Sequence, residues 1–229
     1  MNTHCLKVAL RTTIPVFLGY ISCGIAFGLV TVNAGYPWWL APAMGILIFA
    51  GAGQFLAVPL FAAGTPVLAI LATELLLNIR HIVYGLPLIN QFNGCGRSKP
   101  YLIFALTDET YSLLCDGETP YPEYADLYRF LVSLFNHLYW ITGCVLGSLL
   151  GAVLPFSTAG IEFSMTALFI ASFTEQWLRT KDHIPALTGL LATLLCLVVL
   201  GPENFLIPAM LLITLILTLL RGRLGRKAV

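Results

Sequence analysis

Four side chains that carry charge or hydrogen bonds interrupt the apolar run 66–90: Glu74, Asn78, Arg80 and His81. An ionisable group at membrane depth costs roughly 2.5–3.5 kcal/mol, so several in one helix need partners or a hydrated passage. At about 100° per residue, Glu74, Asn78 and His81 share one stripe of a helix, whereas Arg80 points elsewhere. Such a stripe can hold a polar ligand, and histidine changes charge near neutral pH. The alternative is a polar network that only holds helices together.

A second interruption comes earlier in the chain. Gly51, Ala52 and Gly53 are followed by Gln54 and, a turn and a half later, by Pro59. Glycine and proline weaken intrahelical hydrogen bonding, so a discontinuous helix is predicted here. Many transporters bind substrate at the freed backbone groups of such helices. The alternative is a tightly packed crossing point with one satisfied glutamine.

An acidic pair, Asp108 and Glu109, interrupts the short apolar segment 101–115. Consecutive helical positions diverge by about 100°, so the two carboxylates cannot easily share one ligand. We expect one of them to approach Arg80 or His81 and the other to face water. Alternatively, the segment is too short to span a membrane and both carboxylates lie near an interface.

Composition places the whole chain, residues 1–229, in a membrane. It is 58% hydrophobic and 10% charged, with a mean hydropathy of +0.87, which is typical of an all-α polytopic membrane protein and excludes a soluble catalytic domain. At about 20 residues per helix there is room for seven or eight transmembrane helices. A net charge of +1 gives no sign of a nucleic-acid partner. Six cysteines without a CxxC pair predict neither a disulfide framework nor a metal site, and no cofactor is expected.

The expected membrane segments are about 12–32, 38–62, 66–90, 101–115, 131–154, 161–178, 184–200 and 206–220. If all eight cross from a cytoplasmic start, both termini are cytoplasmic and most basic residues fall inside, while Arg97 and Lys99 fall outside. A re-entrant segment 38–62 or 101–115 would change this count, so the topology of the middle is left open.

The segment 131–154 carries Gly143, Gly147 and Gly151 at four-residue spacing. Small residues at this spacing predict a face for close helix packing, and it is a candidate docking face for a partner protein. His137, near the start of the same segment, is expected to be a packing or interfacial residue.

An internal repeat is predicted between about 12–115 and about 128–220, carried by short matching apolar sequences. The repeat pairs Gln54 with Glu175 or Gln176 across a pseudo-symmetric centre, where transporters commonly bind substrate. Whether the repeats are parallel or inverted is left open.

Three motifs in this order resemble the AzlC family, the large subunits of two-component branched-chain amino acid exporters. They are Ala50-Gly51-Ala52-Gly53-Gln54-Phe55, Asn78-Ile79-Arg80-His81 with Tyr84-Gly85, and Thr107-Asp108-Glu109. The resemblance covers nearly the whole chain. One departure is Ile161-Glu162-Phe163, where Leu-Asp-Phe is expected, and it puts the role of that carboxylate in doubt.

The resemblance implies export of valine, leucine, isoleucine or methionine across the plasma (inner) membrane of a bacterium. It also implies a small AzlD-type membrane subunit as partner. Two other classes remain to be weighed. An intramembrane enzyme has no support from a GxSG, GxGD or HExxH pattern, so the chain is not expected to be an enzyme. A non-transporting scaffold or sensor subunit is the alternative function.

For the exporter, we hypothesise a site that matches an amino acid zwitterion. Backbone amides of 51–53 with Gln54 hold the carboxylate, Glu74 with Asn78 faces the ammonium group, and Phe55 with nearby aliphatic side chains takes the side chain. No GxxxxGK[ST] motif indicates nucleotide hydrolysis. Proton coupling is therefore expected through the ionisable residues Glu74, His81, Asp108 and Glu109. Arg80 is expected to be a structural counter-ion to Asp108 or Glu109.

Overall fold

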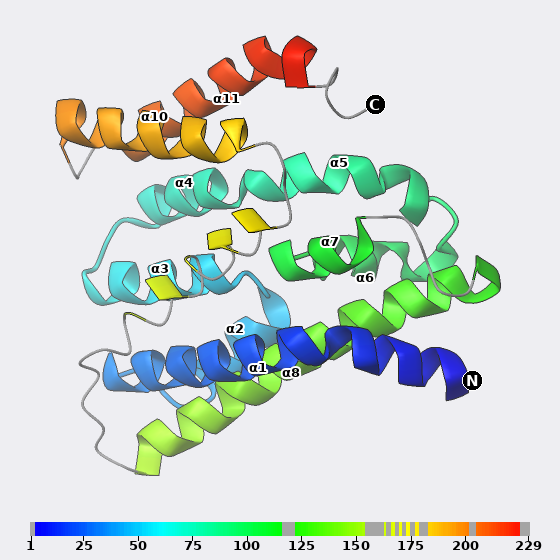
Figure 1. Ribbon diagram of the computed structural model, residues 1–229. Coiled ribbons are helices and arrows are strands. Elements are labelled where there is room, and N and C mark those ends of the chain that lie inside the picture. Colours follow the sequence, from blue (N-terminus) through cyan, green and yellow to red (C-terminus); the bar gives the residue numbers. More distant parts are fainter. Residues whose placement is uncertain are drawn as a thin grey trace. The chain divides into compact units, whose positions relative to one another are not determined.

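The computed structural model describes residues 3–115, 122–153, 183–201 and 205–224, with single residues and pairs between 163 and 178. Every regular element in this described part is a helix (Figure 1), as the composition predicts. The chain divides into two compact units, Met1–Leu168 and Phe169–Val229.

Two long helices, α1 (Thr3–Asn33) and α8 (Ala125–Val153), form the frame of the first unit. They run in the same direction, because the hydroxyl of Tyr128 donates to Thr12 near their starts and their glycines meet near their ends. In the described part of the chain, these are the two helices that are long and apolar enough to cross a membrane. The two ends of this frame are named below after residues of α1, as the Cys5 end and the Asn33 end.

The glycines of α1 and α8 allow the two backbones to touch. A β-carbon on Gly24 would lie 2.9 Å from the α-carbon of Gly143, and one on Gly147 would collide with the carbonyl oxygen of Ile25. The predicted packing face on α8 is therefore confirmed. It is already covered by α1, which corrects the expectation that it docks a partner.

Replacing Gly147 with alanine is expected to destabilise the folded protein by about 1–3 kcal/mol, because the new methyl group meets backbone that cannot move aside. Thermal unfolding of the purified protein in detergent measures this as a lower Tm. The control is Gly19→Ala on α1, where an added β-carbon has none of the described atoms within 4 Å. Equal Tm values for the two variants would contradict the packing described here.

The second predicted membrane segment, 38–62, consists of two half-helices, α2 (Leu40–Leu47) and α3 (Gly51–Ala62). Between them the backbone leaves the helical path, and Phe49 adopts a φ of 44°, in the left-handed region that bulky residues rarely occupy. The predicted discontinuity is confirmed, and it falls immediately before the glycines.

The two half-helices form a re-entrant hairpin that enters and leaves at the Asn33 end (Figure 1). At its tip the ring of Phe49 lies 6.2 Å from the ring of Tyr20, halfway along α1. On the way back, the ring of Phe55 lies 5.3 Å from that of Phe27, close to the Asn33 end. The sequence left open whether segment 38–62 crosses the membrane or is re-entrant, and the structure has the re-entrant arrangement.

The chain then passes from the Asn33 end to the Cys5 end through α4 (Val67–Asn78) and α5 (Arg80–Phe92). The sequence predicts one helix over 66–90, and the structure interrupts it at Ile79. The side chain of Asn78 donates to the backbone carbonyl of Glu74, 2.9 Å away, and such bonds compete with the helical hydrogen bonds. The prediction of an uninterrupted helix is wrong at this point.

A second re-entrant hairpin consists of α6 (Lys99–Phe104) and α7 (Asp108–Leu114). It starts and finishes at the Cys5 end, where Leu102 and Leu114 belong to the same apolar cluster as Cys5. Its tip reaches Tyr20, whose hydroxyl lies 2.6 Å from the Thr107 hydroxyl. The segment 101–115 therefore turns back and does not span, which agrees with the alternative that it is too short to cross a membrane.

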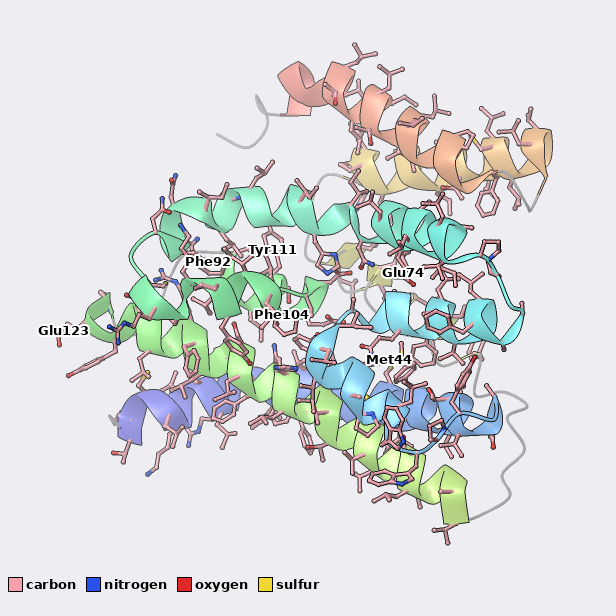
Figure 2. The ribbon with its side chains drawn as sticks, turned by 180° about the vertical axis from the view of Figure 1, so that it is seen from behind. Met44, Glu74, Phe92, Phe104, Tyr111 and Glu123 are labelled. Atoms are coloured by element: carbon pink, nitrogen blue, oxygen red, sulfur yellow. The ribbon has the colours of Figure 1, made fainter. Side chains whose placement is uncertain are left out.

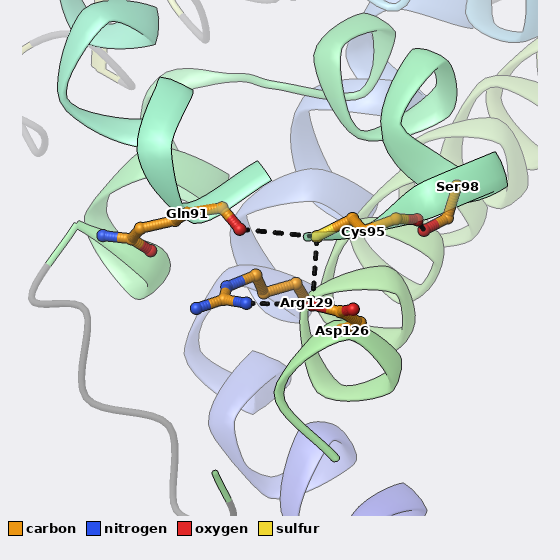
Figure 3. A network of polar contacts seen from close by, with 5 residues as sticks. All are labelled: Gln91, Cys95, Ser98, Asp126 and Arg129. Carbon is orange, nitrogen blue, oxygen red and sulfur yellow. Dashed lines mark hydrogen bonds and ion pairs between the residues drawn. The ribbon is translucent and has the colours of Figure 1, made fainter. Parts of the chain in front are cut away.

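A polar cluster lies at the Cys5 end, next to the short helices η1 (Gly96–Ser98) and η2 (Pro122–Tyr124) (Figure 3). The thiol of Cys95 and the guanidinium of Arg129 each donate to Asp126 over 3.2 Å. Burial and then the neighbouring Asp126 carboxylate raise the pKa of the Cys95 thiol, so it stays protonated and can donate this bond.

Two re-entrant hairpins change the topology. Because 38–62 and 101–115 turn back, Arg97 and Lys99 lie at the Cys5 end, the end that also carries Lys7. The expected seven to eight crossings are not confirmed by the described part of the chain.

The second unit contains α10 (Ile184–Leu200) and α11 (Leu206–Leu224), which pack against each other. Most of the predicted segment 161–178 lies outside the described residues, including Glu162, Glu175 and Gln176. The internal repeat therefore stays a prediction.

Candidate functional site

The tips of the two hairpins are joined by His137 of α8. Its Nε2 atom lies 3.1 Å from the carbonyl oxygen of Gly45 in α2, and its Nδ1 atom lies 3.0 Å from the hydroxyl of Tyr101 in α6. A carbonyl only accepts, so Nε2 carries the proton and Nδ1 accepts from Tyr101. The ring of Phe49 lies 4.4 Å from the imidazole. One side chain thus holds both hairpins.

Gly53, Glu74 and Asn78 meet where α3 packs on α4. Figure 2 shows Glu74 between these two helices. The amide nitrogen of Asn78 donates to Oε2 of Glu74 over 3.1 Å. A β-carbon on Gly53 would collide with that same oxygen and would lie 3.2 Å from the Asn78 amide nitrogen. The glycine is therefore needed for the carboxylate and the amide to reach the backbone of α3.

This cluster keeps unused hydrogen-bonding capacity. Oε1 of Glu74 and Oδ1 of Asn78 are buried and accept no hydrogen bond from the described residues. Buried polar atoms are nearly always paired in folded proteins, so unpaired acceptors at a helix contact suit a ligand that brings its own donors.

For the exporter expected from the sequence, replacing Gly53 with alanine should lower amino acid export about ten- to a hundred-fold, because the methyl group displaces the Glu74 carboxylate. Export of valine from cells and the amount of protein in the membrane are both measured. Gly189→Ala is the control, since a β-carbon there has open space among the described atoms. Normal export by the Gly53 variant would show that this contact is dispensable.

The N-terminus of α3 lies beside the same cluster and has no side-chain cap. The first helical hydrogen bond joins the amide of Gln54 to the carbonyl of Ala50 over 2.8 Å, so the amides of residues 51–53 have no earlier turn to bond to. The positive end of the helix dipole and these amides favour an anion such as a carboxylate.

The side chain of Gln54 points away from Glu74 and toward α8. It is fully buried, and its Oε1 atom accepts a hydrogen bond from the indole of Trp140 over 3.0 Å. Its amide nitrogen has no partner among the described residues. Phe55 packs on Phe27 in the core and faces α1. The structure therefore brings Gly53, but neither Phe55 nor the Gln54 side chain, against Glu74.

His81 stays close to the cluster. Its Nδ1 atom lies 3.1 Å from the backbone carbonyl of Asn78, at the interruption between α4 and α5. The predicted stripe of Glu74, Asn78 and His81 is thus linked by hydrogen bonds. The side chain of Arg80 lies outside the described part, so its predicted ion pair stays a prediction.

Asp108 and Glu109 are the first two residues of α7. Thr107 caps this helix by accepting the amide of Thr110, and Asp108 and Glu109 occupy the first turn, where negative charge is favoured. The hydroxyl of Tyr20 donates to Oε2 of Glu109 over 2.7 Å. Glu109 is therefore half-buried against Tyr20, which lies halfway along α1, in contrast to the interfacial position that the sequence left open.

Three further side chains of the site, Tyr20 on α1 and Asn136 and Trp140 on α8, were not predicted from the sequence. His137 was expected to be a packing or interfacial residue, and its contacts with both hairpins agree with that expectation. Asn136, His137 and Trp140 lie within about one and a half turns of α8. The adjacent polar residues Asn136 and His137 interrupt an apolar run there, as the polar residues of 66–90 do. The same pattern in the sequence could therefore have indicated Asn136 as a site residue. Among the described residues, no group of His, Cys, Asp or Glu is placed to hold a metal ion.

Two helices long and apolar enough to span a membrane, with two re-entrant hairpins whose tips both contact Tyr20, are typical of membrane proteins of the transport class. The profile described as "AzlC protein" matches residues 15–154. The chain belongs to the AzlC family.

Three relatives illustrate the family. The "Branched-chain amino acid transport protein AzlC" of Bacillus subtilis is 39% identical over 100% of this chain and 94% of the relative. An "Uncharacterized membrane protein" of Helicobacter pylori is 40% identical over 95% of this chain and 96% of its own length. The "Inner membrane protein YgaZ" of Escherichia coli is 26% identical over 80% of this chain and 78% of the relative. No solved structure matches.

Proposed function

We propose that this protein is a secondary exporter of branched-chain amino acids, with valine, leucine, isoleucine and methionine as its substrates. The observation that carries the proposal is the Gly53–Glu74–Asn78 cluster, with unpaired acceptors beside the N-terminus of α3, which no side chain caps. Such a site offers opposite charges to the two ends of a zwitterion. The Bacillus subtilis relative, named as a branched-chain amino acid transport protein, supports this substrate class.

The substrate carboxylate binds the amides of residues 51–53 at the start of α3, where the helix dipole favours it. The ammonium group binds Oε1 of Glu74 and Oδ1 of Asn78, the two buried acceptors of the cluster. Ile70, buried one turn before Glu74 on α4, provides apolar surface for the side chain. One methylene in such a pocket is worth about 1–3 kcal/mol, so discrimination among these substrates is weak.

Protons drive export in this proposal. Glu74, His81, Asp108 and Glu109 are the ionisable candidates, and the contacts described for three of them form two separate sets. Glu74 and His81 belong to the substrate cluster, linked through Asn78. Glu109 lies at the tip of the second hairpin and is bonded to Tyr20. Competition between a proton and the ammonium group for Glu74 would couple the two movements.

The Cys5 end faces the bacterial cytoplasm in this proposal, and the membrane is the plasma (inner) membrane. Lys7, Arg97 and Lys99 at this end agree with the preference of positive charge for the cytoplasmic side. The basic residues of the C-terminal tail agree with a cytoplasmic C-terminus. A small AzlD-type membrane subunit completes the exporter.

The test loads cells with dipeptides of valine, leucine or methionine and follows the intracellular free amino acids. Cells that produce this chain together with the small subunit should accumulate less of the exported amino acid than cells with either protein alone. Unchanged accumulation in every combination would leave the scaffold or sensor role as the better account.

A further inference from the structure

One face of α8 carries a row of buried polar side chains. Arg129, Ser133, Asn136 and Trp140 are spaced by four, three and four residues, which places them on one side of the helix. Ser133 and Asn136 are 0% exposed, and Arg129 is 9% exposed. The row runs from the Cys5 end to the meeting point of the two hairpins.

The row has unused hydrogen-bonding atoms at each step. Nε of Arg129, Oγ of Ser133 and Oδ1 of Asn136 are buried and unpaired within the described part of the chain. The amide nitrogen of Gln54, next to Trp140, continues the series at its inner end. Buried polar groups retain water when they lack protein partners, so a row of them favours a file of water.

A chain of hydroxyl groups continues from this row to Glu109. The amide of Asn136 donates to the Thr110 hydroxyl over 3.0 Å, and the hydroxyls of Thr110 and Thr107 are also 3.0 Å apart. Thr107 lies 2.6 Å from the Tyr20 hydroxyl, and Tyr20 donates to Glu109 over 2.7 Å. A hydroxyl can both donate and accept, so each one can pass on a proton while it receives another.

The same contacts serve both charge states of the carboxyl group. When Glu109 is charged it can only accept, so the Tyr20 hydroxyl donates to it over the 2.7 Å contact. When Glu109 is protonated, the carboxylic acid can donate to Tyr20 and the hydroxyl protons of Tyr20 and Thr107 can point away from Glu109. No hydrogen bond is lost in this exchange, which suits a group that takes up and releases a proton in each cycle.

The outer end of the row is electrically balanced. Arg129 forms an ion pair with Asp126, whose side chain is 50% exposed at the Cys5 end (Figure 3). The positive charge of Arg129 is thereby compensated at the mouth of the row. Of the other ionisable groups nearby, His137 is committed to Gly45 and Tyr101 on the hairpins, and Asp108 precedes Glu109 in the first turn of α7.

We propose that this face of α8 is the path by which protons move between the Cys5 end and Glu109. The proposal rests on the proton-coupled export proposed above. A proton enters beside Asp126, passes along water at Ser133 and Asn136, and continues through Thr110, Thr107 and Tyr20. Each hydroxyl releases one proton and receives one, and the last transfer, from Tyr20, turns the Glu109 carboxylate into a carboxylic acid.

The test compares two substitutions of equal volume at Ser133, the step without any protein partner among the described residues. Ser133→Thr keeps the hydroxyl, and Ser133→Val replaces it with a methyl group of similar size. Ser148→Ala is the control for loss of a buried serine, because Ser148 on the same helix is 0% exposed and also unpaired but packs against α1 beside Gly28.

Everted membrane vesicles with the small subunit present are given labelled valine under two regimes. In the first, an imposed pH gradient drives net valine uptake, which in everted vesicles represents export. In the second, valine exchanges for valine without a gradient, which requires substrate binding but no net proton movement. We expect Ser133→Val to lower gradient-driven uptake at least about ten-fold and exchange by less than about two-fold.

The Ser133→Thr and Ser148→Ala variants should keep both activities within about two-fold of the unmodified protein, since neither removes a hydroxyl from the row. Equal gradient-driven uptake by the valine and threonine variants would overturn the path, and so would a parallel loss of uptake and exchange in Ser133→Val. If the unmodified protein shows exchange but no response to the gradient, the path and proton coupling both fail, and valine transport stands. If it moves no valine at all, the proposed function itself fails.

Discussion

Replacing Glu74 with glutamine is expected to abolish valine export driven by a pH gradient, while the protein still inserts into the membrane. Glutamine keeps the size of the side chain and one acceptor next to Asn78 and Gly53. In the proposed mechanism, it removes the charge that faces the substrate ammonium group and the site that a proton and the substrate share. Gradient-driven uptake into everted vesicles measures the loss, and immunodetection of the membrane fraction measures insertion.

The matched control is Glu123→Gln, which removes a carboxylate that is exposed at the Cys5 end (Figure 2). We expect this variant to export valine normally. His81→Ala should resemble Glu74→Gln, because His81 is linked to the same cluster through Asn78. Normal export by both the Glu74 and His81 variants would remove these residues from the mechanism.

Replacing His137 with leucine is expected to cause the largest loss of stability. The change leaves the carbonyl of Gly45 and the hydroxyl of Tyr101 without their shared partner. Each buried polar group left unpaired costs about 1–3 kcal/mol, so the two together account for roughly 2–6 kcal/mol. The Tm of the purified protein in detergent should fall, and both hairpins should become accessible to protease together.

His137→Gln separates the hydrogen bonds from mere volume, because a glutamine amide can donate to Gly45 and accept from Tyr101. We expect it to recover part of the lost stability. A Tm for His137→Leu equal to that of the original protein would show that the imidazole does not hold the hairpins.

The positions of the helix breaks can be predicted from the sequence better than the direction that the chain takes after each break. Glycines next to Gln54 predicted the break between α2 and α3, because glycine is a poor helix former wherever it occurs. They did not predict that the chain turns back, since that depends on Tyr20 and His137, which lie in distant helices. The break at Ile79 carries neither glycine nor proline, and comes instead with side-chain bonds of Asn78 and His81.

The candidate site shows the same division. Helical periodicity correctly grouped Glu74 with Asn78, which lie four residues apart on α4. His81 contacts the backbone carbonyl of Asn78 from the first turn of α5, across the break at Ile79. Neighbouring positions on α3 were harder to assign: Gly53 faces Glu74, whereas Phe55 faces the core. Each residue turns the helix by about 100°, so only the positions of α1, α4 and α8 around α3 decide which face each side chain meets.

The long-range bonds of the first hairpin also constrain how the protein is made. The partners of Gly45 and Gln54 are His137 and Trp140, which follow them by 92 and 86 residues. A ribosome adds roughly 5–20 residues per second, so the hairpin waits on the order of ten seconds for them. During that interval the Gly45 carbonyl and the Gln54 side chain need other hydrogen-bond partners such as water, and a chain that stops before α8 leaves both without the partners they have in the folded protein.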